Sequence, residues 1–567
     1  VRALLQDVLH LERGPVEENM PTGVELVKTL HKGNRKRGLA WAYDTPFCVV
    51  HTKQGEEAAE EYLQAILLGY SAMSPFGASA AAASLAQTLE ERELALYMNE
   101  LFDKWMAAGA EAKKRWVMYA ASVHGGGDII HKMCRQIQEW PKASRGAIAV
   151  EAVQALAMNP LPQALMAVDD IWRKSKYKQV KDAAGTVLES TASRLGITME
   201  ELADRIVPDL GFDENMERCF DYGARRFKVA ITAALEVEVF GEDGKKLKNL
   251  PAPGKRDDAT KAAAAYEEFK QMKKLMKTVV QSQKARLERA LSSGRQWSVG
   301  AWKNLFVKNP IMHQFAIGLI WGIYEEGLLT ASFRYMEDGS FNTEDGEEFE
   351  FPQEGQEDVP QESPKDAQGR PAALGTGRRI GIVHPMDLTE ESKRAWEEQL
   401  SDYEITQPIE QLDRPVFYVD QEEQDRKKLE RFGGILMNDL SLGGKMQSLG
   451  WDRGPILDAA CFDCFYREDP EVSMGAVLYF SGSCVWGFNE DATIYEAKFY
   501  RLKSTAAEAG TKQEESVYEK SSEKNACLLG EVPKRYFSEI VLQLTRATAS
   551  GSGRNEDWKK KSGNATS

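Results

Sequence analysis

The sequence lacks any apolar run of the roughly 20 residues that a membrane-crossing helix requires. Its longest candidate, residues 315–324, is about half that length and predicts a buried helix. Near the N-terminus, Leu4, Leu5 and Val8 recur at helical spacing, which is not the pattern of a signal peptide. We therefore expect a cytoplasmic protein, with the nucleus as an alternative, and no membrane partner.

Cysteine is scarce and unpaired in the sequence. Seven residues are spread over 567 positions, which is typical of a reducing compartment. Cys461 and Cys464 form a lone C-x-x-C without the further ligands of a structural zinc site, so we expect buried thiols. The seven histidines are not at metal-binding spacing, except loosely His124 and His131. The sequence therefore predicts no metal and no cofactor.

The usual catalytic templates are also missing. Three glycines follow His124, but no G-x-S-x-G accompanies them, so they predict a turn between helices rather than an oxyanion loop. The run ending in Lys445 fails as a phosphate-binding loop because Asp439 and Met446 occupy two required positions. The glycine-rich stretch 375–381 does not follow a predicted strand, which excludes a dinucleotide fingerprint. These failures favour a protein without enzymatic activity.

Positive charge is in the minority, with 72 Lys and Arg against 87 Asp and Glu and a net charge of −15. Residues 245–289 are the exception, because 13 basic and 5 acidic residues there give 13 − 5 = +8. This basic segment predicts a docking surface for nucleic acid, a phosphorylated partner or the protein's own acidic loop. The alternative is the solvated face of a long amphipathic helix.

Residues 56–213 predict helix after helix, with apolar residues at three- and four-residue steps and short breakers between them. Ala152, Val153 and Leu156 recur about thirty residues later as Ala183, Ala184 and Leu188. Paired helices at such a period are typical of a HEAT-like solenoid. An irregular helical bundle is the alternative.

Beyond Asp213 the hydrophobic period changes to two, which indicates strands and an α+β domain. Asp257 or Asp258 is expected to cap a long helix that ends near Leu291, and Ser298 to cap the next. The predicted strands lie at 227–231, 235–239, 331–335, 380–383, 416–419, 476–480 and 496–500.

Segments with few apolar residues complete the expected domain organisation. Residues 336–368 hold twelve Asp and Glu against one Lys, which predicts disorder. The expected parts are a partly helical N-terminal segment (1–55), HEAT-like helical repeats (56–213), a first α+β part (214–335), a disordered acidic loop (336–378), a second α+β part (379–546) and a disordered tail (547–567).

A series of short motifs in the second half resembles a known family. The series runs through Asp221–Phe227, Lys248–Asp258, Arg286–Glu288, Gly294–Ser298, Leu319–Gly322, Phe333–Arg334, Gly381–Pro385, Gln407–Pro408, Gln411–Arg414, Gly530–Pro533 and Phe537–Glu539. In this order it resembles the C-terminal domain of the molybdate metabolism regulator (MolR-like) proteins. In that family the domain follows helical repeats and often a WGR domain, which this sequence does not contain.

The resemblance implies a set of candidate binding residues but no established enzymatic activity. The candidates, together with the basic residues near the predicted helix start, are Arg225, Arg226, Lys255, Arg256, Asp258, Arg295, Trp297, Arg334, His384, Gln407 and Arg414. The sequence begins with Val1 rather than Met, so we expect a fragment of a longer protein in which another domain can precede it.

Three functions remain open at this point. The first is a non-enzymatic regulatory or scaffold protein that binds a protein or anionic partner through its helical repeats and basic segment. The second is an enzyme acting on a nucleotide or another phosphate-containing substrate. The third is a nucleic-acid-associated factor that works with a WGR domain outside this sequence.

Overall fold

A computed structural model describes residues 27–28, 34–351, 377–502 and 515–559. The chain divides into two compact units between Pro208 and Asp209. Within its described residues the first unit is built mainly of helices, and the second combines antiparallel sheets with helices. The expected fold class, helical repeats followed by an α+β domain, is therefore confirmed.

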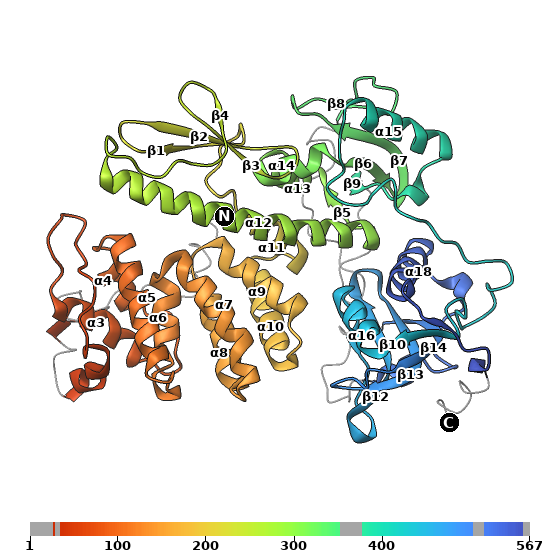
Figure 1. Ribbon diagram of the computed structural model, residues 1–567, viewed down its shortest axis with the longest axis horizontal. Coiled ribbons are helices and arrows are strands. Elements are labelled where there is room, and N and C mark those ends of the chain that lie inside the picture. The colour runs from red at the N-terminus through yellow and green to blue at the C-terminus, as the bar shows by residue number, and fades with distance from the viewer. Residues whose placement is uncertain (1–26, 29–33, 352–376, 503–514, 560–567) are drawn as a thin grey trace. The chain divides into compact units, whose positions relative to one another are not determined.

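The first unit consists of helical hairpins that stack on one another (Figure 1). After a 3-10 helix at Asn34–Ala42 come α3 (Glu60–Ser71), α4 (Ala80–Ala86), α5 (Glu91–Ala107), a 3-10 turn at Ala112–Lys114, α6 (Trp116–His124), α7 (Gly126–Lys142), α8 (Gly146–Leu156), α9 (Pro162–Lys174), α10 (Lys178–Arg194) and α11 (Met199–Arg205). Consecutive helices pair as α5–α6, α7–α8 and α9–α10. The first members, α5, α7 and α9, contact one another in turn, and so do α6, α8 and α10. This is the nearest-neighbour packing of a solenoid.

Small residues allow the hairpins to approach closely. Of the repeated residues, Ala152 and Val153 of α8 and Ala184 of α10 are completely buried, and Ala183 is partly buried. A β-carbon added at Gly185 would lie 3.0 Å from the indole nitrogen of Trp172, so α9 and α10 meet too closely there for a larger residue. The repeated alanine pattern in the sequence therefore follows from helix packing.

Two buried asparagines hold the glycine turn that follows His124. The Asn99 amide nitrogen donates to the Gly125 carbonyl at 2.8 Å, and that of Asn159 donates to the Gly126 carbonyl at 2.9 Å. The α6 helix ends at His124 and α7 begins at Gly126, so Gly125 alone separates the two helices, and Gly126 and Gly127 belong to the first turn of α7. Their geometry is explained by helix packing.

The second unit contains three antiparallel sheets. The first has the order β1-β2-β3-β4, the second β5-β9-β6-β7-β8, and the third β11-β12-β13-β14-β10-β15. Their strands are β1 (Glu217–Asp221), β2 (Arg226–Ile231), β3 (Val237–Phe240), β4 (Lys246–Leu247), β5 (Gln296–Ser298), β6 (Ile320–Glu325), β7 (Leu328–Tyr335), β8 (Phe341–Asn342), β9 (Arg379–Ile382), β10 (Ile435–Asn438), β11 (Asp452–Arg453), β12 (Cys461–Asp469), β13 (Met474–Cys484), β14 (Asp491–Arg501) and β15 (Gly553–Arg554).

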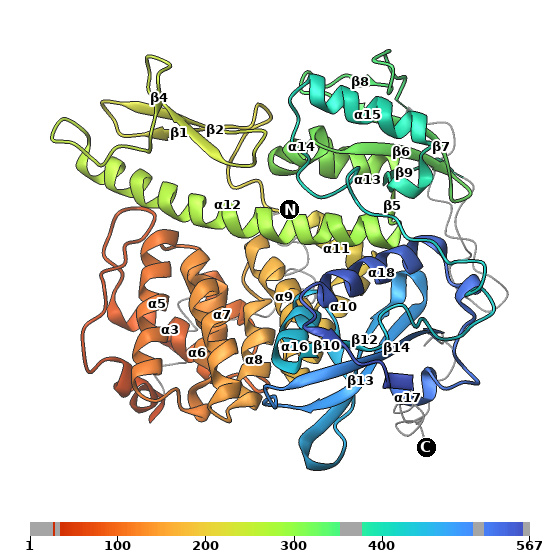
Figure 2. The same ribbon diagram turned by 45° about the vertical axis from the view of Figure 1, so that its right-hand side comes forward.

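The helices of this unit connect and cover the sheets (Figure 2). They are α12 (Ala259–Ser293), α13 (Val299–Trp302), a π-helical turn (Lys303–Val307), α14 (Pro310–Ile317), α15 (Glu390–Asp402), α16 (Asp439–Ser448), α17 (Val517–Lys520) and α18 (Lys534–Thr548), with 3-10 turns at Pro385–Asp387, Asp458–Ala460, Pro470–Val472 and Leu529–Glu531. The Asp258 carboxylate caps α12 by accepting from the Thr260 and Lys261 amides, as expected. Phe269 of α12 packs edge-on against Phe220 of β1.

Residues 315–324 are not the single buried helix that their composition predicted. The α14 helix ends at Ile317, and Ile320–Glu325 forms β6, between β9 and β7 in the second sheet. A central strand buried on both faces has the same continuous apolar sequence as a buried helix, so hydrophobicity alone did not distinguish them.

Part of the expected acidic loop is ordered. Phe341 lies in β8 and stacks on Phe351 with ring centroids 4.3 Å apart, and both rings contact the buried indole of Trp302. These aromatic residues bury enough surface to order the segment up to Phe351 despite its carboxylates. Residues 352–376 of the expected loop lie outside the described residues.

Two further expectations differ from the structure. Residues 416–419 form no strand, because this extended segment docks on α18, where the Phe417 amide donates to the Ser538 hydroxyl at 2.9 Å. The expected tail is also ordered as far as residue 559. There β15 pairs with β10, and the buried Trp558 ring packs on the backbone of Gly433 and Gly434. Residues 560–567 lie outside the described residues.

Trp558→Ala should lower the free energy of unfolding of the second unit by about 3 kcal/mol, because it removes a buried ring from the edge of the third sheet. Thermal unfolding followed by circular dichroism measures the change. Trp486→Ala is the matched control, since Trp486 is 72% exposed and its removal should change stability by less than about 0.5 kcal/mol. Equal midpoints for wild type and Trp558→Ala would contradict a structural role for the C-terminal residues.

Candidate functional site

The eleven candidate residues do not surround one cavity. Arg225, Arg226, Lys255, Arg256 and Asp258 belong to the first sheet and the start of α12. Arg295, Trp297 and Arg334 belong to the second sheet, and His384, Gln407 and Arg414 to the segments that follow β9. The candidates therefore lie in three separate parts of the second unit, each with its own chemical environment.

At the first sheet, Arg225 holds the loop that precedes α12. Its guanidinium donates to both carboxylate oxygens of Asp257 at 2.9 and 2.6 Å, and Asp257 also accepts from the Gly254 amide. Hydrogen bonding to Arg225 lowers the pKa of Asp257. Arg225 is thus paired within the fold. By contrast, the side chains of Lys255 and Arg256 in the same loop are exposed.

Arg226 and Asp258 have local roles at this place. The Arg226 amide donates to the Glu242 carboxylate at 3.2 Å, and its guanidinium is exposed. The Asp258 carboxylate is occupied by its capping hydrogen bonds, so the structure assigns it to the start of α12.

In the second sheet the candidate residues are part of the packing. Trp297 is buried in β5, and the Arg295 guanidinium lies 4.9 Å from its ring centroid. Arg334 is 2% exposed in β7, where its guanidinium lies over the Tyr403 ring and donates to the Met336 sulfur. Burial lowers the pKa of Arg334. A cation held by an aromatic face and a thioether is stabilised without a carboxylate.

Gln407 acts through a second glutamine. Its amide donates to the Gln411 oxygen at 2.8 Å, and its own oxygen accepts from the Leu412 amide. Gln411 is completely buried, accepts from the Ile320 amide, and donates to the carbonyls of Ile320 and Val383. The two glutamines therefore fasten the segment after α15 to β6 and to the end of β9.

His384 and Arg414 meet at a residue that the sequence analysis did not select. Glu539 of α18 is 1% exposed and accepts from the Arg414 Nε and a terminal nitrogen, both at 2.7 Å. His384 Nε2 lies 3.1 Å from the same carboxylate. Because His384 Nδ1 accepts from the Met386 amide, the ring hydrogen lies on Nε2 and is donated to Glu539.

Two further groups complete this buried cluster. Arg414 Nη1 donates to the Glu288 carboxylate of α12 at 2.9 Å, and the Ser292 hydroxyl donates to Glu539 at 2.9 Å. Burial raises the pKa of Glu539, but the hydrogen bonds from Arg414 and His384 outweigh it and lower this pKa to about 2. We call Glu288, His384, Arg414 and Glu539 the carboxylate–arginine cluster.

The cluster has the composition of a catalytic centre but not its accessibility. His384, Arg414 and Glu539 are at most 5% exposed, and Glu539 holds its partners on both carboxylate oxygens. Glu288 is the one partly exposed member, and its carboxylate is paired with Arg414. A general base must reach a substrate proton, which this arrangement prevents. The geometry is that of a buried staple between α12, the segment after β9, and α18.

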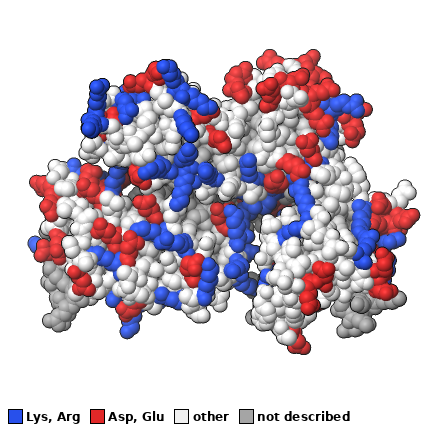
Figure 3. Space-filling view, in the orientation of Figure 1, with Lys and Arg blue, Asp and Glu red and all other residues white. Residues whose placement is uncertain are grey.

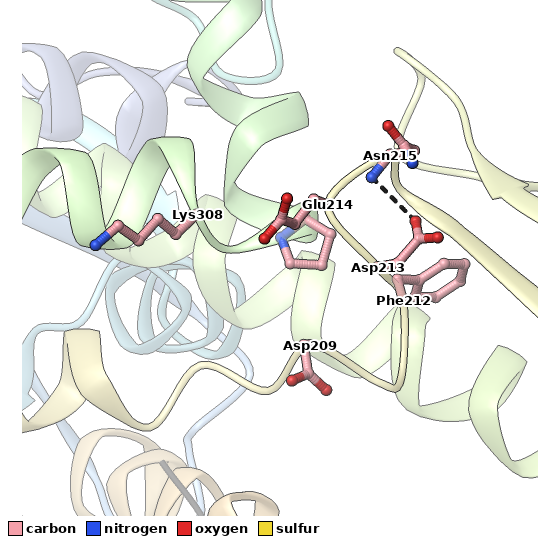
Figure 4. A pocket seen from close by; sticks show the side chains of 7 residues that line it. Asp209, Phe212, Asp213, Glu214, Asn215 and Lys308 are labelled. Atoms are coloured by element: carbon pink, nitrogen blue, oxygen red, sulfur yellow. Dashed lines mark hydrogen bonds between the residues drawn. The ribbon is translucent and has the colours of Figure 1, made fainter.

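One open pocket of about 420 Å3 lies elsewhere in the second unit. Its lining comes from the segment before β1 and from the start of α14: Asp209, Phe212, Asp213, Glu214, Asn215, Lys308 and Pro310. Figure 4 shows the Asp213 carboxylate turned toward Asn215. It accepts a hydrogen bond from the backbone N–H of Asn215 at 3.0 Å. None of the eleven candidate residues lines this pocket.

The surface of α12 carries a row of cations. Lys270, Lys274, Lys277 and Lys284 are all exposed, and their spacing of four, three and seven residues places them along one side of the helix. At 1.5 Å per residue the row is about 21 Å long. Lys270 pairs with Glu267 at 3.1 Å. We call these four residues the lysine row.

Charge is unevenly distributed over the second unit. In Figure 3, Lys and Arg predominate over the part that contains β1–β4 and α12, whereas Asp and Glu gather over the part that contains α15 and β8. Among the described residues, no group of three His, Cys, Asp or Glu side chains is arranged to hold a metal ion. Nor is any described helix sufficiently long and apolar to pass through a membrane.

In a comparison with known proteins, part of the second unit matches a protein family. A family described as a domain of unknown function (DUF4132) matches residues 244–451. Uncharacterized protein YehI of Escherichia coli (strain K12) is 31% identical over 368 residues, which are 64% of this chain and 28% of that protein. The chain thus spans little more than a quarter of that relative's length. No solved structure matches.

Sequence reasoning missed the partners of its own candidates. Glu288 and Glu539 both lie in the motif series, but neither was selected, because acidic residues are common on helix surfaces. Glu539 is 125 residues from Arg414 along the chain. The sequence shows only that Arg414 and Glu539 both lie in the same motif series. The fold shows that they pair.

Glu539→Gln should reduce the free energy of unfolding at pH 7 by about 3 kcal/mol, because it leaves the buried Arg414 with only the partly exposed Glu288 as a counter-charge. The folded-state pKa of Glu539 is lowered from 4.5 to about 2. Its stabilisation is therefore present above pH 4.5 and is lost as the pH falls toward 2. Urea unfolding at pH 7 and pH 3 measures both effects.

The difference between wild type and Glu539→Gln should consequently be smaller at pH 3. Glu531→Gln is the control, because Glu531 is exposed shortly before α18 and should change stability little at either pH. A wild-type protein no more stable than Glu539→Gln at pH 7 would show that the cluster is not a structural staple.

Proposed function

We propose that this protein is a non-enzymatic regulatory or scaffold protein that binds an anionic partner along the lysine row of α12. The row is the observation that carries the proposal. It presents four exposed cations on one side of a rigid helix, inside the segment whose charge is +8 although the chain carries −15. The exposed Lys255 and Arg256 precede the same helix and add to its positive potential.

The pairing of the other candidates supports a binding function over catalysis. Arg225, Arg414 and His384 are engaged with carboxylates of the protein itself, and Gln407 with Gln411. An enzyme acting on a nucleotide or phosphate compound would need several such groups at one accessible site. The stacked hairpins of the first unit supply the extended surface that repeat proteins commonly use for protein partners.

We also propose that the protein is related to the MolR-like proteins and that it is cytoplasmic. The motif series carries that relationship, and the family matched over residues 244–451 is described without a function. Association with nucleic acid, alone or together with a WGR domain elsewhere in a longer protein, is the alternative in which the lysine row contacts a phosphate backbone.

Lys274→Gln/Lys277→Gln/Lys284→Gln should weaken binding to a polyanion at least tenfold at 50 mM salt. It should also reduce the slope of log affinity against log salt by about 2.7 for duplex DNA, because each phosphate contact contributes about 0.9. Fluorescence anisotropy with a 20-base-pair DNA and with a 20-residue glutamate-rich peptide measures this. The probe that binds more tightly distinguishes nucleic acid from an acidic protein segment.

Arg394→Gln/Lys524→Gln/Lys534→Gln is the matched control, since it removes three exposed cations elsewhere in the second unit. It should retain nearly the wild-type affinity. Equal losses in the two triple variants would mean that only net charge matters, and unchanged binding in the lysine-row variant would refute the proposed surface.

A further inference from the structure

Five large apolar side chains are exposed at one end of the third sheet. Trp486 is 72% exposed, Ile456 65%, Phe488 53%, Leu440 49% and Leu457 47%. They come from the β11–β12 loop, the β13–β14 loop and the first turn of α16. Single exposed apolar residues are ordinary, but a group of this size marks an interaction surface. We call these residues the apolar tip.

The three segments form one continuous surface. The Val485 amide donates to the Ala460 carbonyl at 3.0 Å, and the Arg453 guanidinium donates to the Val485 carbonyl at 3.0 Å. These bonds join the β11–β12 loop to the β13–β14 loop. A β-carbon at Gly487 would lie 2.2 Å from Leu440, so α16 also packs directly on the β13–β14 loop.

A buried carboxylate holds the tip in shape. Asp439 is 5% exposed and accepts from the Phe488 amide at 2.6 Å and from the amides of Leu440 and Glu490. In the neighbouring loop, Ala459 and Ala460 have φ values of 56° and 58°, in the left-handed region that favours glycine. Strained backbone of this kind persists where the surrounding structure enforces it, and it concentrates at functional sites.

The charges around the tip are mostly negative. Asp452, Asp458, Glu490 and Asp491 are exposed within or beside the same loops, with Arg453 as the exposed cation among them. An apolar partner with carboxylates of its own would be repelled, whereas Lys or Arg residues beside its apolar side chains would be attracted. The complementary partner is therefore both apolar and basic.

We propose that the apolar tip binds a basic amphipathic segment of another protein, with the segment's apolar side chains over Trp486 and Phe488. Its Lys and Arg residues pair with Asp458, Glu490 and Asp491. An amphipathic helix presents these two chemistries on adjacent faces. This surface lies outside the lysine row and selects the opposite charge, so it goes beyond the function proposed above.

The test uses the full chain and a labelled 18-residue amphipathic peptide of Leu and Lys, with the Leu/Glu peptide of the same pattern as the comparison. The chain carries Lys274→Gln/Lys277→Gln/Lys284→Gln in every arm, so that the lysine row does not bind the Leu/Glu peptide. In this background, fluorescence anisotropy should show binding of the Leu/Lys peptide and at least tenfold weaker binding of the Leu/Glu peptide. Trp486→Ser/Phe488→Ser should weaken the Leu/Lys complex at least tenfold. Asp458→Asn/Glu490→Gln/Asp491→Asn should weaken it and reduce its salt dependence.

Leu328→Ser is the matched control, because Leu328 is also 72% exposed but lies in β7 of the second sheet. It should bind the Leu/Lys peptide as the wild type does. The proposal is overturned by equal affinity for the two peptides, by unchanged binding in Trp486→Ser/Phe488→Ser, or by no binding of the Leu/Lys peptide at 100-fold molar excess.

Two cysteines beneath the tip support a second, independent proposal. Cys461 and Cys484 are directly opposite each other in the antiparallel pair β12–β13, so their side chains point to the same face. The hydrogen bond from Val485 to Ala460 is made by the adjacent pair. The cysteines therefore occupy a non-hydrogen-bonded position, where the α-carbons are about 4.5 Å apart, within the range that a disulfide spans.

We infer that this thiol pair is oxidised reversibly to a disulfide by hydrogen peroxide. Both thiols are free, and Cys461 is partly exposed, so its sulfur can reach peroxide and react first. The Cys461 sulfur takes one peroxide oxygen to give a sulfenic acid and one water. The Cys484 sulfur then displaces the second water and forms the S–S bond, so two thiols and one peroxide yield one disulfide and two waters.

Peroxide treatment of the full chain, alkylation and peptide mass spectrometry should detect a peptide pair joined through Cys461 and Cys484 and 2 Da lighter than its two thiols. Dithiothreitol should release it. Cys464→Ser should retain the cross-link, because Cys464 is buried opposite Tyr479, and Cys484→Ser should lose it. Cross-linking of Cys461 to Cys464, or full alkylation of Cys461 and Cys484 after peroxide, would exclude the inference.

Discussion

The second unit depends on one buried carboxylate. Glu539 projects from α18 and binds the arginine, histidine and serine of three other segments, none of which lies near it in sequence. Removing a charged carboxylate from water has a large free-energy cost. The buried charge is therefore stable only when all of its hydrogen-bonding capacity is satisfied. The relative positions of α12, the segment after β9, and α18 are therefore coupled, since moving any one of them would leave a buried charge without its partner.

The α12 helix contributes both to the carboxylate–arginine cluster in the interior and to the lysine row on the surface of the unit. Near its C-terminal end, Glu288 belongs to the carboxylate–arginine cluster and Ser292 donates to Glu539. In its N-terminal half, Phe269 packs on the first sheet. A helix held at both places is a rigid support for the lysine row between them. Rigidity favours recognition, because the cations are ordered before a partner arrives and little conformational entropy is lost on binding.

Local sequence signals predicted much of this fold. The side chains of Asp258 and Ser298 cap the helices that they were expected to cap, because capping involves only the next few residues. The helices of the first unit followed from their apolar period. By contrast, β6 was taken for helix, and several strands were missed, among them β1, β12 and the short strands β8 and β15. For β8 and β15 the reason is long-range packing. Their stability comes from β7, β10 and the aromatic rings packed on them, which lie elsewhere in the sequence.

The candidate site shows the same division. Its charged residues, His384 and Arg414 among them, could be named from the motif series, and so could the positive charge of residues 245–289. The sequence by itself therefore determined the fold class, the charge pattern and the polar residues of interest. Only the tertiary structure decided that Arg414 forms a buried ion pair with Glu539. It also decided that the lysine row and the apolar tip face solvent. Burial and long-range pairing depend on which segments meet, and that is a property of the whole folded unit.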